Sequence, residues 1–378
     1  MRKFNYQLSM KMILVMFITI VLDLLGIAFL ALKFVSVPFV PSRNIDNMSD
    51  YYTAVWESVK GRSNDNGRFF VIDITNNSRD EIASILESVN SMNPRVIGLD
   101  VTNIWEEDES IDKHFVNTIK SIPNIILPIE CYDMEQNTPH FLYSIFREQL
   151  IEKNYGVVSF PETRDILRTY CPQFKDGNKT LDAFGCAIAK AYGANLRSVG
   201  ENDNVLINYT TLHLTDEDAN EGREFLNLSK QDSTSLASEI NGRIVLVGST
   251  NLSSDKHLTP LGYDLSGVMV HAHIINSLID NRSITSTPLI LRYVLCCLFA
   301  FFAFVILKKY KKVDGNKNNI WWSIIKCTLL FLLSMMLFAG IGTILFCKFC
   351  YYVDFAPYIV TLILVYILKD KSISIKIK

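Results

Sequence analysis

The chain has 378 residues, and its 37 Lys and Arg residues nearly balance 39 Asp and Glu residues. This balance argues against a nucleic-acid binder, whose folded part is usually basic. Hydrophobic residues make up 49% of the chain but are unevenly placed, with long uncharged stretches near both ends and a charged, mixed segment between them. This distribution predicts a membrane protein with a folded domain in the middle.

The first uncharged stretch predicts a transmembrane helix over residues 12–33, after a short N-terminal segment, 1–11. Its apolar run is long enough to cross a bilayer, too long for an ordinary signal peptide, and has no convincing A-x-A cleavage site. Asp23 lies in the middle of this span, where an ionised carboxylate is costly. We expect a protonated Asp23 bonded to a neighbouring helix, nearer in depth to Ser334 than to Lys326. Packing between helices explains this residue better than ion transport, which usually needs broken helices or repeats.

The segment that follows has the pattern of an α/β domain. RFFVIDI (68–74) and RVIGLDV (95–101) have the length of buried strands, and the helix predicted between them begins with a Ser78-x-x-Glu81 capping box. Continuous apolar strands separated by helices predict a mixed, mostly parallel sheet covered by helices on both faces. We expect one such domain over residues 34–287. Its further elements are a helix over 111–122, a strand over 124–129, a helix over 181–193, strands over 205–209 and 243–248, and a helix over about 270–278.

Polar residues end several of these strands. Asp73, Asp100 and Glu130 each follow an apolar run, and Ser249 and Thr250 follow Gly248. The carboxyl ends of parallel strands meet at one edge of a sheet, where ligands of open α/β sheets tend to bind. We therefore predict a polar cleft at this edge. The alternative is that these acids only cap turns and cover exposed amides.

The loop RIVLVGSTNLSSDKHLTPLG (243–262) raises two further possibilities. A nucleophile elbow needs a glycine on both sides of the serine and a helix directly behind it, which this loop lacks, so we predict no catalytic residue and no enzyme. His271 and His273 would point about 200° apart on a helix, so we predict no metal site and no cofactor. The ligand-binding candidates are Asp73, Asp100, Ser249, Thr250, Asp255, His257, Thr259 and His271.

Three more apolar stretches predict spans over residues 288–307, 322–346 and 352–368. Four spans leave both termini on one side of the membrane. Lys and Arg collect in the N-terminal segment, in the loop 308–321 and in the tail 369–378, which places all three in the cytoplasm and the central domain outside.

The cysteines do not form a disulfide scaffold. Cys131, Cys171 and Cys186 lie in the outer domain and allow at most one bridge among themselves, whereas Cys347 and Cys350 form a C-x-x-C pair at the outer membrane face. The sequence leaves open whether any of these five forms a disulfide.

Several motifs in order resemble the second type of CHASE domain, the cyclase/histidine-kinase-associated sensing extracellular domain. GRIVLVGST, Asp255, LTPLG (258–262) and GVMVHA (267–272) resemble its terminal block. FFVIDI, VIGLDV, Asp112 before Phe115, and NIILP resemble its opening strands, and Gly156 with Asp165 and Arg168 resembles its middle D-x-x-R turn. The resemblance covers roughly residues 66–282, and one span before the domain and three after it are also typical.

This resemblance implies an extracytoplasmic sensory domain in a bacterial cytoplasmic (inner) membrane, in a family whose members usually act on a cytoplasmic kinase, cyclase or phosphodiesterase. Only ten residues follow Leu368. We therefore expect a sensor that binds an unknown ligand or protein outside the cell, forms homo-oligomers or joins a partner signalling protein, and signals through that partner. A structural or assembly factor that docks another envelope protein is the alternative.

Overall fold

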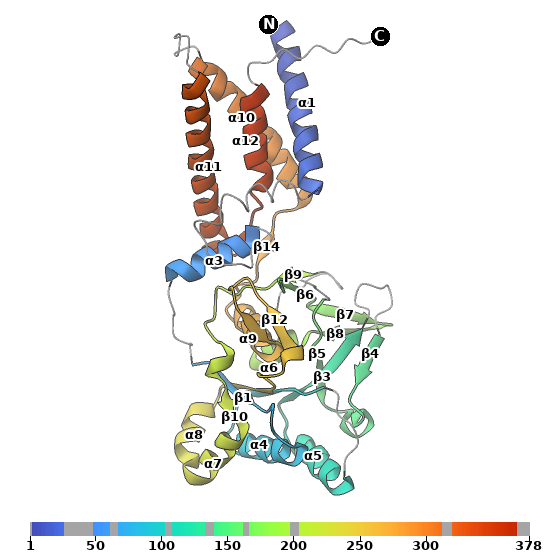
Figure 1. Cartoon of the computed structure of the whole chain (residues 1–378). Coiled ribbons are helices and arrows are strands. Elements are labelled where there is room, and N and C mark those ends of the chain that lie inside the picture. Colours follow the sequence, from blue (N-terminus) through green and yellow to red (C-terminus); the bar gives the residue numbers. More distant parts are fainter. Residues whose placement is uncertain are drawn as a thin grey trace. The chain divides into compact units, whose positions relative to one another are not determined.

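The computed structural model describes residues 2–25, 48–60, 67–102, 108–132, 140–161, 166–196, 204–311 and 320–368. The chain forms two units (Figure 1). Val59–Ile284 makes an α/β domain, and Met1–Ser58 together with Thr285–Lys378 makes a helical unit. Most of helix α3 (Met48–Lys60) therefore belongs with the helices, although residues 34–287 were expected to form one outer domain.

The α/β domain is built on one mostly parallel sheet. Its strand order is β10-β1-β11-β2-β3-β4, and β5 also pairs with β3. Every pair is parallel except β3 with β4. The sheet thus confirms the predicted mixed, mainly parallel architecture. The strands are β1 (Phe69–Asp73), β2 (Val96–Asp100), β3 (Ile125–Tyr132), β4 (His140–Tyr143), β5 (Asn154–Val157), β10 (Asn220–Glu221) and β11 (Ile244–Gly248).

Alternate side chains of each central strand enter two separate cores. In β1, Phe69 and Val71 face one core, and Phe70 and Ile72 face the other. Helices cover both faces, as a sheet of continuous apolar strands requires (Figure 1). The first core lies under α6 (Phe184–Tyr192) and α9 (Gly267–Ile279); the second lies under α4 (Arg79–Ser91), α5 (Glu109–Ser121), α7 (Gly222–Gln231) and α8 (Ser233–Ile240).

Helix α4 begins at the predicted capping box. The Glu81 amide donates to Ser78 Oγ at 3.3 Å, and the Ser78 amide donates to Glu81 Oε2 at 2.8 Å. The next residue, Arg79, is buried and forms an ion pair with Asp112 at the start of α5. Asp112 therefore links the two helices that cover one face of the sheet.

The strand expected over residues 205–209 is shorter and lies outside the main sheet. It runs only over β9 (Val205–Leu206), which pairs antiparallel with β6 (Thr169–Tyr170). Asn208 ends it, because its side-chain oxygen accepts hydrogen bonds from the Thr210 amide at 3.1 Å and hydroxyl at 2.6 Å, which turns the chain. The smaller elements are β7 (Gln173–Asp176), β8 (Lys179–Asp182), β12 (Lys256–Leu258) and β13 (Asp264–Ser266), and the short 3₁₀ helices η1 (Arg147–Leu150), η2 (Asp216–Asp218) and η3 (Ser253–Asp255).

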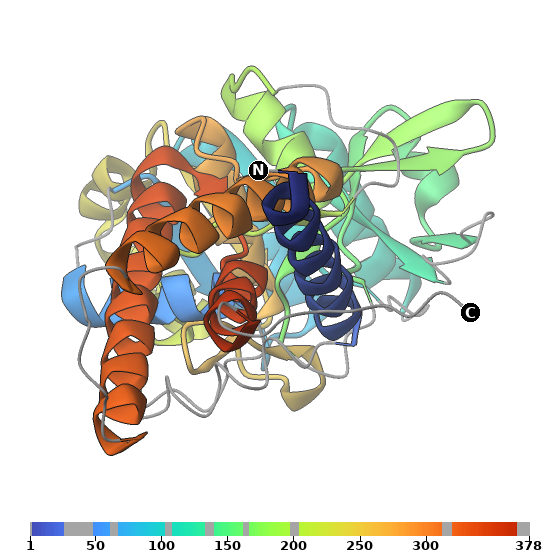
Figure 2. The ribbon, with the colours of Figure 1, turned by 90° about the horizontal axis from the view of Figure 1, so that it is seen from above.

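The helical unit contains four long helices, with α12 in contact with the other three (Figure 2). They are α1 (Arg2–Leu24), α10 (Leu289–Lys311), α11 (Ile320–Phe349) and α12 (Ala356–Leu368). Within the described residues, one stretch, Leu289–Ile306, is long and apolar enough to cross a membrane; Met336–Phe349 and Ala356–Leu368 are shorter apolar stretches. Helix α1 begins earlier than the predicted span over 12–33, whose last residues lie outside the described ranges, so the arrangement of four spans stays a prediction.

Candidate functional site

The predicted strand ends are neighbours at one edge of the sheet. The register aligns Asp73 of β1 with Gly248 of β11, and Gly248 with Asp100 of β2. A Cβ at Gly248 would lie 3.1 Å from Asp100 Cβ and 3.2 Å from Val268 Cβ in α9. A glycine at this position therefore lets helix α9 approach the edge closely. We call this region the carboxyl edge, defined by Asp73, Asp100, Gly248 and the first turn of α9.

The side chain of Asp73 holds two turns together through hydrogen bonds. Its Oδ1 accepts hydrogen bonds from the Thr75 amide at 3.0 Å, the Thr75 hydroxyl at 2.5 Å and the Thr250 amide at 3.0 Å. Its Oδ2 accepts one from Asn251 Nδ2 at 2.6 Å. Burial alone would raise the pKa of Asp73, but the hydrogen bonds from Thr75 and Thr250 outweigh it and lower the pKa from its usual value. These contacts are those of a turn-capping carboxylate.

Asp100 has a different environment on the other side of Gly248. Its side chain takes part in no hydrogen bond or ion pair within the described part of the chain. Burial, followed by repulsion from Asp255 and Glu130, raises the pKa of Asp100 to about 8. At neutral pH this carboxyl group is mostly protonated, which makes it able to donate a hydrogen bond as well as to accept one.

Two carboxylates occupy the N-terminus of α9. Asp255 Oδ2 accepts the Gly267 amide at 3.2 Å, and Asp216 Oδ1 accepts the Ser266 amide at 3.2 Å and the Ser266 hydroxyl at 2.5 Å. Lys256 also donates to Asp216. A helix N-terminus attracts anions, but here it is already satisfied by acids of the same chain. No local pattern indicates Asp216, which is 50 residues away from Ser266 in the chain.

An aromatic residue and two histidines lie beside Asp255. His257 Nε2 is 3.8 Å from Asp255 Oδ1, and the His257 ring lies 5.1 Å from the Phe160 ring. His271 stacks on Phe160 with ring centroids 4.7 Å apart. Burial, and then the nearby His257, lower the pKa of His271 to about 3, so its imidazole is neutral at pH 7. These contacts join Asp255, His257, Phe160 and His271 in one cluster, of which sequence reasoning missed Phe160.

The remaining candidates have structural contacts. Thr259 is buried and donates to the Tyr263 carbonyl at 2.7 Å, which closes the turn between β12 and β13. Thr250 is buried beside Asp73, and no hydrogen bond joins Ser249 to His257 among the described residues. No group of three or more His, Cys, Asp or Glu residues in the described ranges could hold a metal ion.

Helix α9 places its two histidines in different surroundings. His271 contacts Phe160 and Phe184, whereas His273 Nε2 lies 3.3 Å from the Leu214 carbonyl and its ring packs 5.2 Å from that of Tyr209. Burial, the main cause, lowers the pKa of His273 to about 4. The two imidazoles are therefore separate, as their expected positions on a helix predict.

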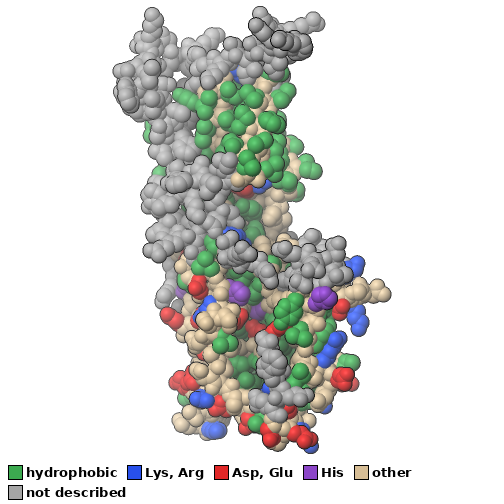
Figure 3. All heavy atoms as spheres, turned by 45° about the vertical axis from the view of Figure 1, so that its right-hand side comes forward, with side chains coloured by type: hydrophobic (Ala, Val, Ile, Leu, Met, Phe, Trp, Pro, Cys, Tyr) green, Lys and Arg blue, Asp and Glu red, His purple; other side chains and the backbone are tan. Residues whose placement is uncertain are grey.

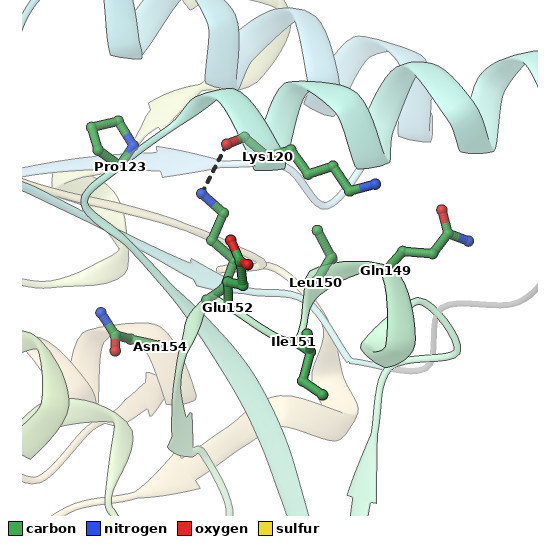
Figure 4. Close-up of a pocket in the computed structure, with 8 residues that line it drawn as sticks. Lys120, Pro123, Gln149, Leu150, Ile151, Glu152 and Asn154 are labelled. Atoms are coloured by element: carbon green, nitrogen blue, oxygen red, sulfur yellow. Dashed lines mark hydrogen bonds between the residues drawn. The ribbon is translucent and has the colours of Figure 1, made fainter.

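A hollow of about 480 Å³ lies at the opposite, amino edge of the sheet (Figure 4). Pro123 precedes β3 and Asn154 begins β5 on its walls, together with Leu150. Lys153 donates to the Lys120 carbonyl at 2.9 Å and to the Ile122 carbonyl at 2.6 Å, so its amine caps the end of α5. A second hollow of about 540 Å³ lies between the ends of α6 and α9. The polar cleft expected at the carboxyl edge stays a prediction.

Asp23 has different partners from those expected. Its Oδ2 accepts hydrogen bonds from Arg292 Nη2 at 2.9 Å and from the Tyr293 hydroxyl at 2.8 Å, both on α10. Asp23 is therefore bonded to a neighbouring helix, as expected, through Arg292 and Tyr293 near the end of α1. Its protonated state stays a prediction. The side chain of Ser334 lies outside the described atoms.

Two further sequence expectations concern the cysteines and the D-x-x-R turn. The described cysteines are thiols, and Cys131, Cys171, Cys186 and Cys347 are buried. Arg168 lies beside the short β6–β9 pair, where its carbonyl accepts the Ile207 amide at 2.7 Å. Asp165, the other half of the D-x-x-R turn, lies outside the described residues.

A family model for the CHASE2 domain matches residues 62–307, which is more than half of the chain. The chain belongs to the CHASE2 domain family. CHASE2 is an extracellular sensory domain, typically found outside the cytoplasm in membrane proteins. The match covers the α/β domain from residue 62 onward and most of α10. Among curated proteins and among solved structures, none gives a significant match to the chain.

Proposed function

We propose that this CHASE2 protein is a membrane-anchored, non-enzymatic sensor that binds a ligand at the carboxyl edge of its α/β domain and signals through a separate partner protein. The contrast between two acids supports the position of the site. Asp73 has four hydrogen-bond donors around it, whereas Asp100, two strands along the same edge, has none in the described ranges. Asp100 is half-buried, and a polar group partly removed from water normally finds a partner, so Asp100 is the group best placed to gain one from a ligand.

The side chains around Asp100 favour one class of ligand. Asp255 and Glu130 are close enough to raise its pKa, and the N-terminus of α9 is already filled by Asp216 and Asp255. An anion would be repelled there by the carboxylates of Asp255 and Glu130. A cationic ligand such as a small amine would pair with Asp100 as the carboxylate, and Phe160 supplies an adjacent apolar surface.

The surface of the helical unit supports a membrane location. Large apolar side chains are exposed on its helices, with Ile290 80% exposed, Phe302 58% and Leu337 60%. Apolar side chains cover the described surface of these helices, while charged side chains gather on the α/β domain (Figure 3). Such a contiguous apolar surface is rare on a soluble monomer. We propose that α1, α10, α11 and α12 all span the membrane, with both termini in the cytoplasm.

A thermal-shift assay of the full-length protein in detergent tests the ligand proposal. Spermidine and ethanolamine are the cationic probes, and succinate is the anionic control. We expect the amines to raise the melting temperature and succinate to have no effect. Because a bound cation favours the ionised form of Asp100, whose pKa is about 8, the amine-induced shift should increase between pH 6 and pH 9.

The matched variant is Asp100→Asn, which keeps the size of the side chain but cannot become a carboxylate. We expect it to abolish the amine-induced shift. The ligand proposal fails if the amines give no shift in the wild type, or if they give the same shift in Asp100→Asn.

A docking role is the second candidate, and one surface favours it. Leu142, Ile145 and Ile151 are 52%, 49% and 74% exposed, and Leu142 lies on β4 at the end of the strand order. A photo-crosslinking residue placed at position 142 in cells would give one discrete adduct if another envelope protein is held there permanently. Absence of an adduct would count against docking.

A further inference from the structure

Both chain connections of the α/β domain are bound to one short segment of the helical unit. This segment, residues 349–354, joins α11 to α12 and is called the junction segment below. On the C-terminal side, β14 (Thr285–Ser286) pairs in parallel with β15 (Tyr351–Tyr352) inside it. The Thr285 amide donates to the Cys350 carbonyl at 2.9 Å, and the Thr287 amide donates to the Tyr352 carbonyl at 3.0 Å. The chain that leaves the α/β domain is thus fixed to the junction segment before α10 begins.

The N-terminal connection is fixed to the same segment through helix α3. Tyr52 is fully buried, and its hydroxyl donates to the Val353 carbonyl at 2.9 Å. Its ring packs 5.7 Å from that of Phe346 and 6.3 Å from that of Tyr352. Helix α3 crosses the end of α11 at this point (Figure 1). The helix that leads into the α/β domain is therefore held by one side chain inserted beside the junction segment.

A glycine of α11 makes room for Tyr52. A Cβ at Gly342 would lie 2.4 Å from both Cζ and Oη of Tyr52 and 2.6 Å from Cε1. Real Cβ atoms do not approach this closely, so any side chain at position 342 displaces the ring and breaks its bond to Val353. At Gly340, two positions earlier on the same helix, a Cβ would meet nothing within 4 Å among the described residues. The two glycines therefore differ in their contact with Tyr52.

The junction segment is also tied to the other helices. Asp354, at its end, accepts the Ala356 amide at 3.0 Å and so caps α12. Its other oxygen accepts Arg292 Nη1 of α10 at 2.9 Å, and Arg292 Nη2 donates to Asp23 near the end of α1 at 2.9 Å. One arginine thus connects the junction segment to both α10 and α1.

We propose that the junction segment is the coupling element of this protein: it holds the two connections of the α/β domain together and transmits their displacement to α1, α10 and α12. This inference rests on the proposed sensory function. Because both connections bind the same few residues, release of one should loosen the other. A conformational change in the α/β domain that moves the two connections apart must also strain the β14–β15 pair or the contact of Tyr52 with the junction segment.

Hydrogen exchange on the full-length protein in detergent tests this coupling without any ligand. In Gly342→Ala, we expect the amides of Thr285 and Thr287 to exchange at least tenfold faster than in the wild type. In Gly340→Ala, we expect wild-type exchange. Tyr52→Phe, which removes only the hydroxyl bonded to Val353, should accelerate the same two amides to a smaller extent and serves if Gly342→Ala does not fold.

Unchanged exchange of Thr285 and Thr287 in both Gly342→Ala and Tyr52→Phe would overturn the proposal, because the two connections would then be held independently. Faster exchange in Gly340→Ala to the same extent would also overturn it, since the effect would not come from Tyr52. Neither result bears on amine binding at Asp100, so failure of this proposal is distinguishable from failure of the sensory one.

Discussion

Replacing Asp73 with alanine should destabilise the α/β domain far more than the same replacement of Asp100. Asp73→Ala removes the acceptor of four hydrogen bonds and leaves the buried Thr250 amide without a partner. An unsatisfied buried donor costs about 1–3 kcal/mol. The Thr75 and Asn251 donors can turn partly to water, so the expected loss is roughly 3 kcal/mol for the set. A domain of this size loses about 2–4 °C in melting temperature per kcal/mol, which gives a fall of about 6–12 °C.

Thermal unfolding of the full-length protein, followed by circular dichroism at pH 7, measures this difference. Asp100→Ala is the matched control, because it removes the same side chain at the same edge without breaking a hydrogen bond, and we expect it to change the melting temperature by less than about 3 °C. The hydrogen bonds lower the pKa of Asp73 in the folded state. Its stabilising effect is therefore present above the unfolded pKa, about 3.9, and is lost as the pH falls through the folded value. Equal losses in the two variants would refute this assignment of roles.

Three further predictions concern other parts of the chain. Gly98→Ala should cost about 1–3 kcal/mol by overpacking, since a Cβ there would lie 2.5 Å from Ile188 Cδ1 and 2.9 Å from Leu246 Cδ2; a wild-type midpoint in urea would contradict this. His114 bonds Asp80 and Glu87 through its two ring nitrogens, which raises its pKa. The wild type should therefore be more stable to unfolding than His114→Gln below the unfolded pKa of about 6.5, and this difference in stability should disappear as the pH rises through the folded pKa of His114. A stability difference that does not depend on pH would exclude an imidazolium bridge. Asp23→Leu should lower the thermal stability of the helical unit in detergent by about 1–3 kcal/mol, because Arg292 loses one of its two carboxylates; unchanged stability would show that the ion pair contributes nothing.

The features that the sequence predicts well are those that depend on local patterns. The apolar runs of β1, β2 and β11 and the Ser78 capping box follow from periodicity and from known helix signals, and all are present in the structure. Parallel pairing then brings Asp73, Gly248 and Asp100 to one edge, because the carboxyl ends of parallel strands align. Predicting that these three residues lie together therefore needs only the knowledge that the sheet is parallel, and no knowledge of contacts between distant side chains.

The features that the sequence did not predict depend on contacts between distant residues. No local pattern distinguishes Asp73 from Asp100, since both follow an apolar strand, and only the tertiary contacts with Thr250 and Asn251 separate their roles. Asp23 shows the same limit. A hydropathy window placed it at mid-span, but its partner Arg292 lies 269 residues away at the start of α10. The strand predicted over 205–209 is too long, because the side chain of Asn208 competes with the strand for backbone donors.

The position of the α/β domain relative to the membrane is the most direct test of the whole account. Protease added to intact spheroplasts that express the chain should cut within residues 59–284 and leave the lysine-rich termini protected until the membrane is broken. Cleavage of the termini in intact spheroplasts, with the α/β domain protected, would contradict an extracytoplasmic sensor.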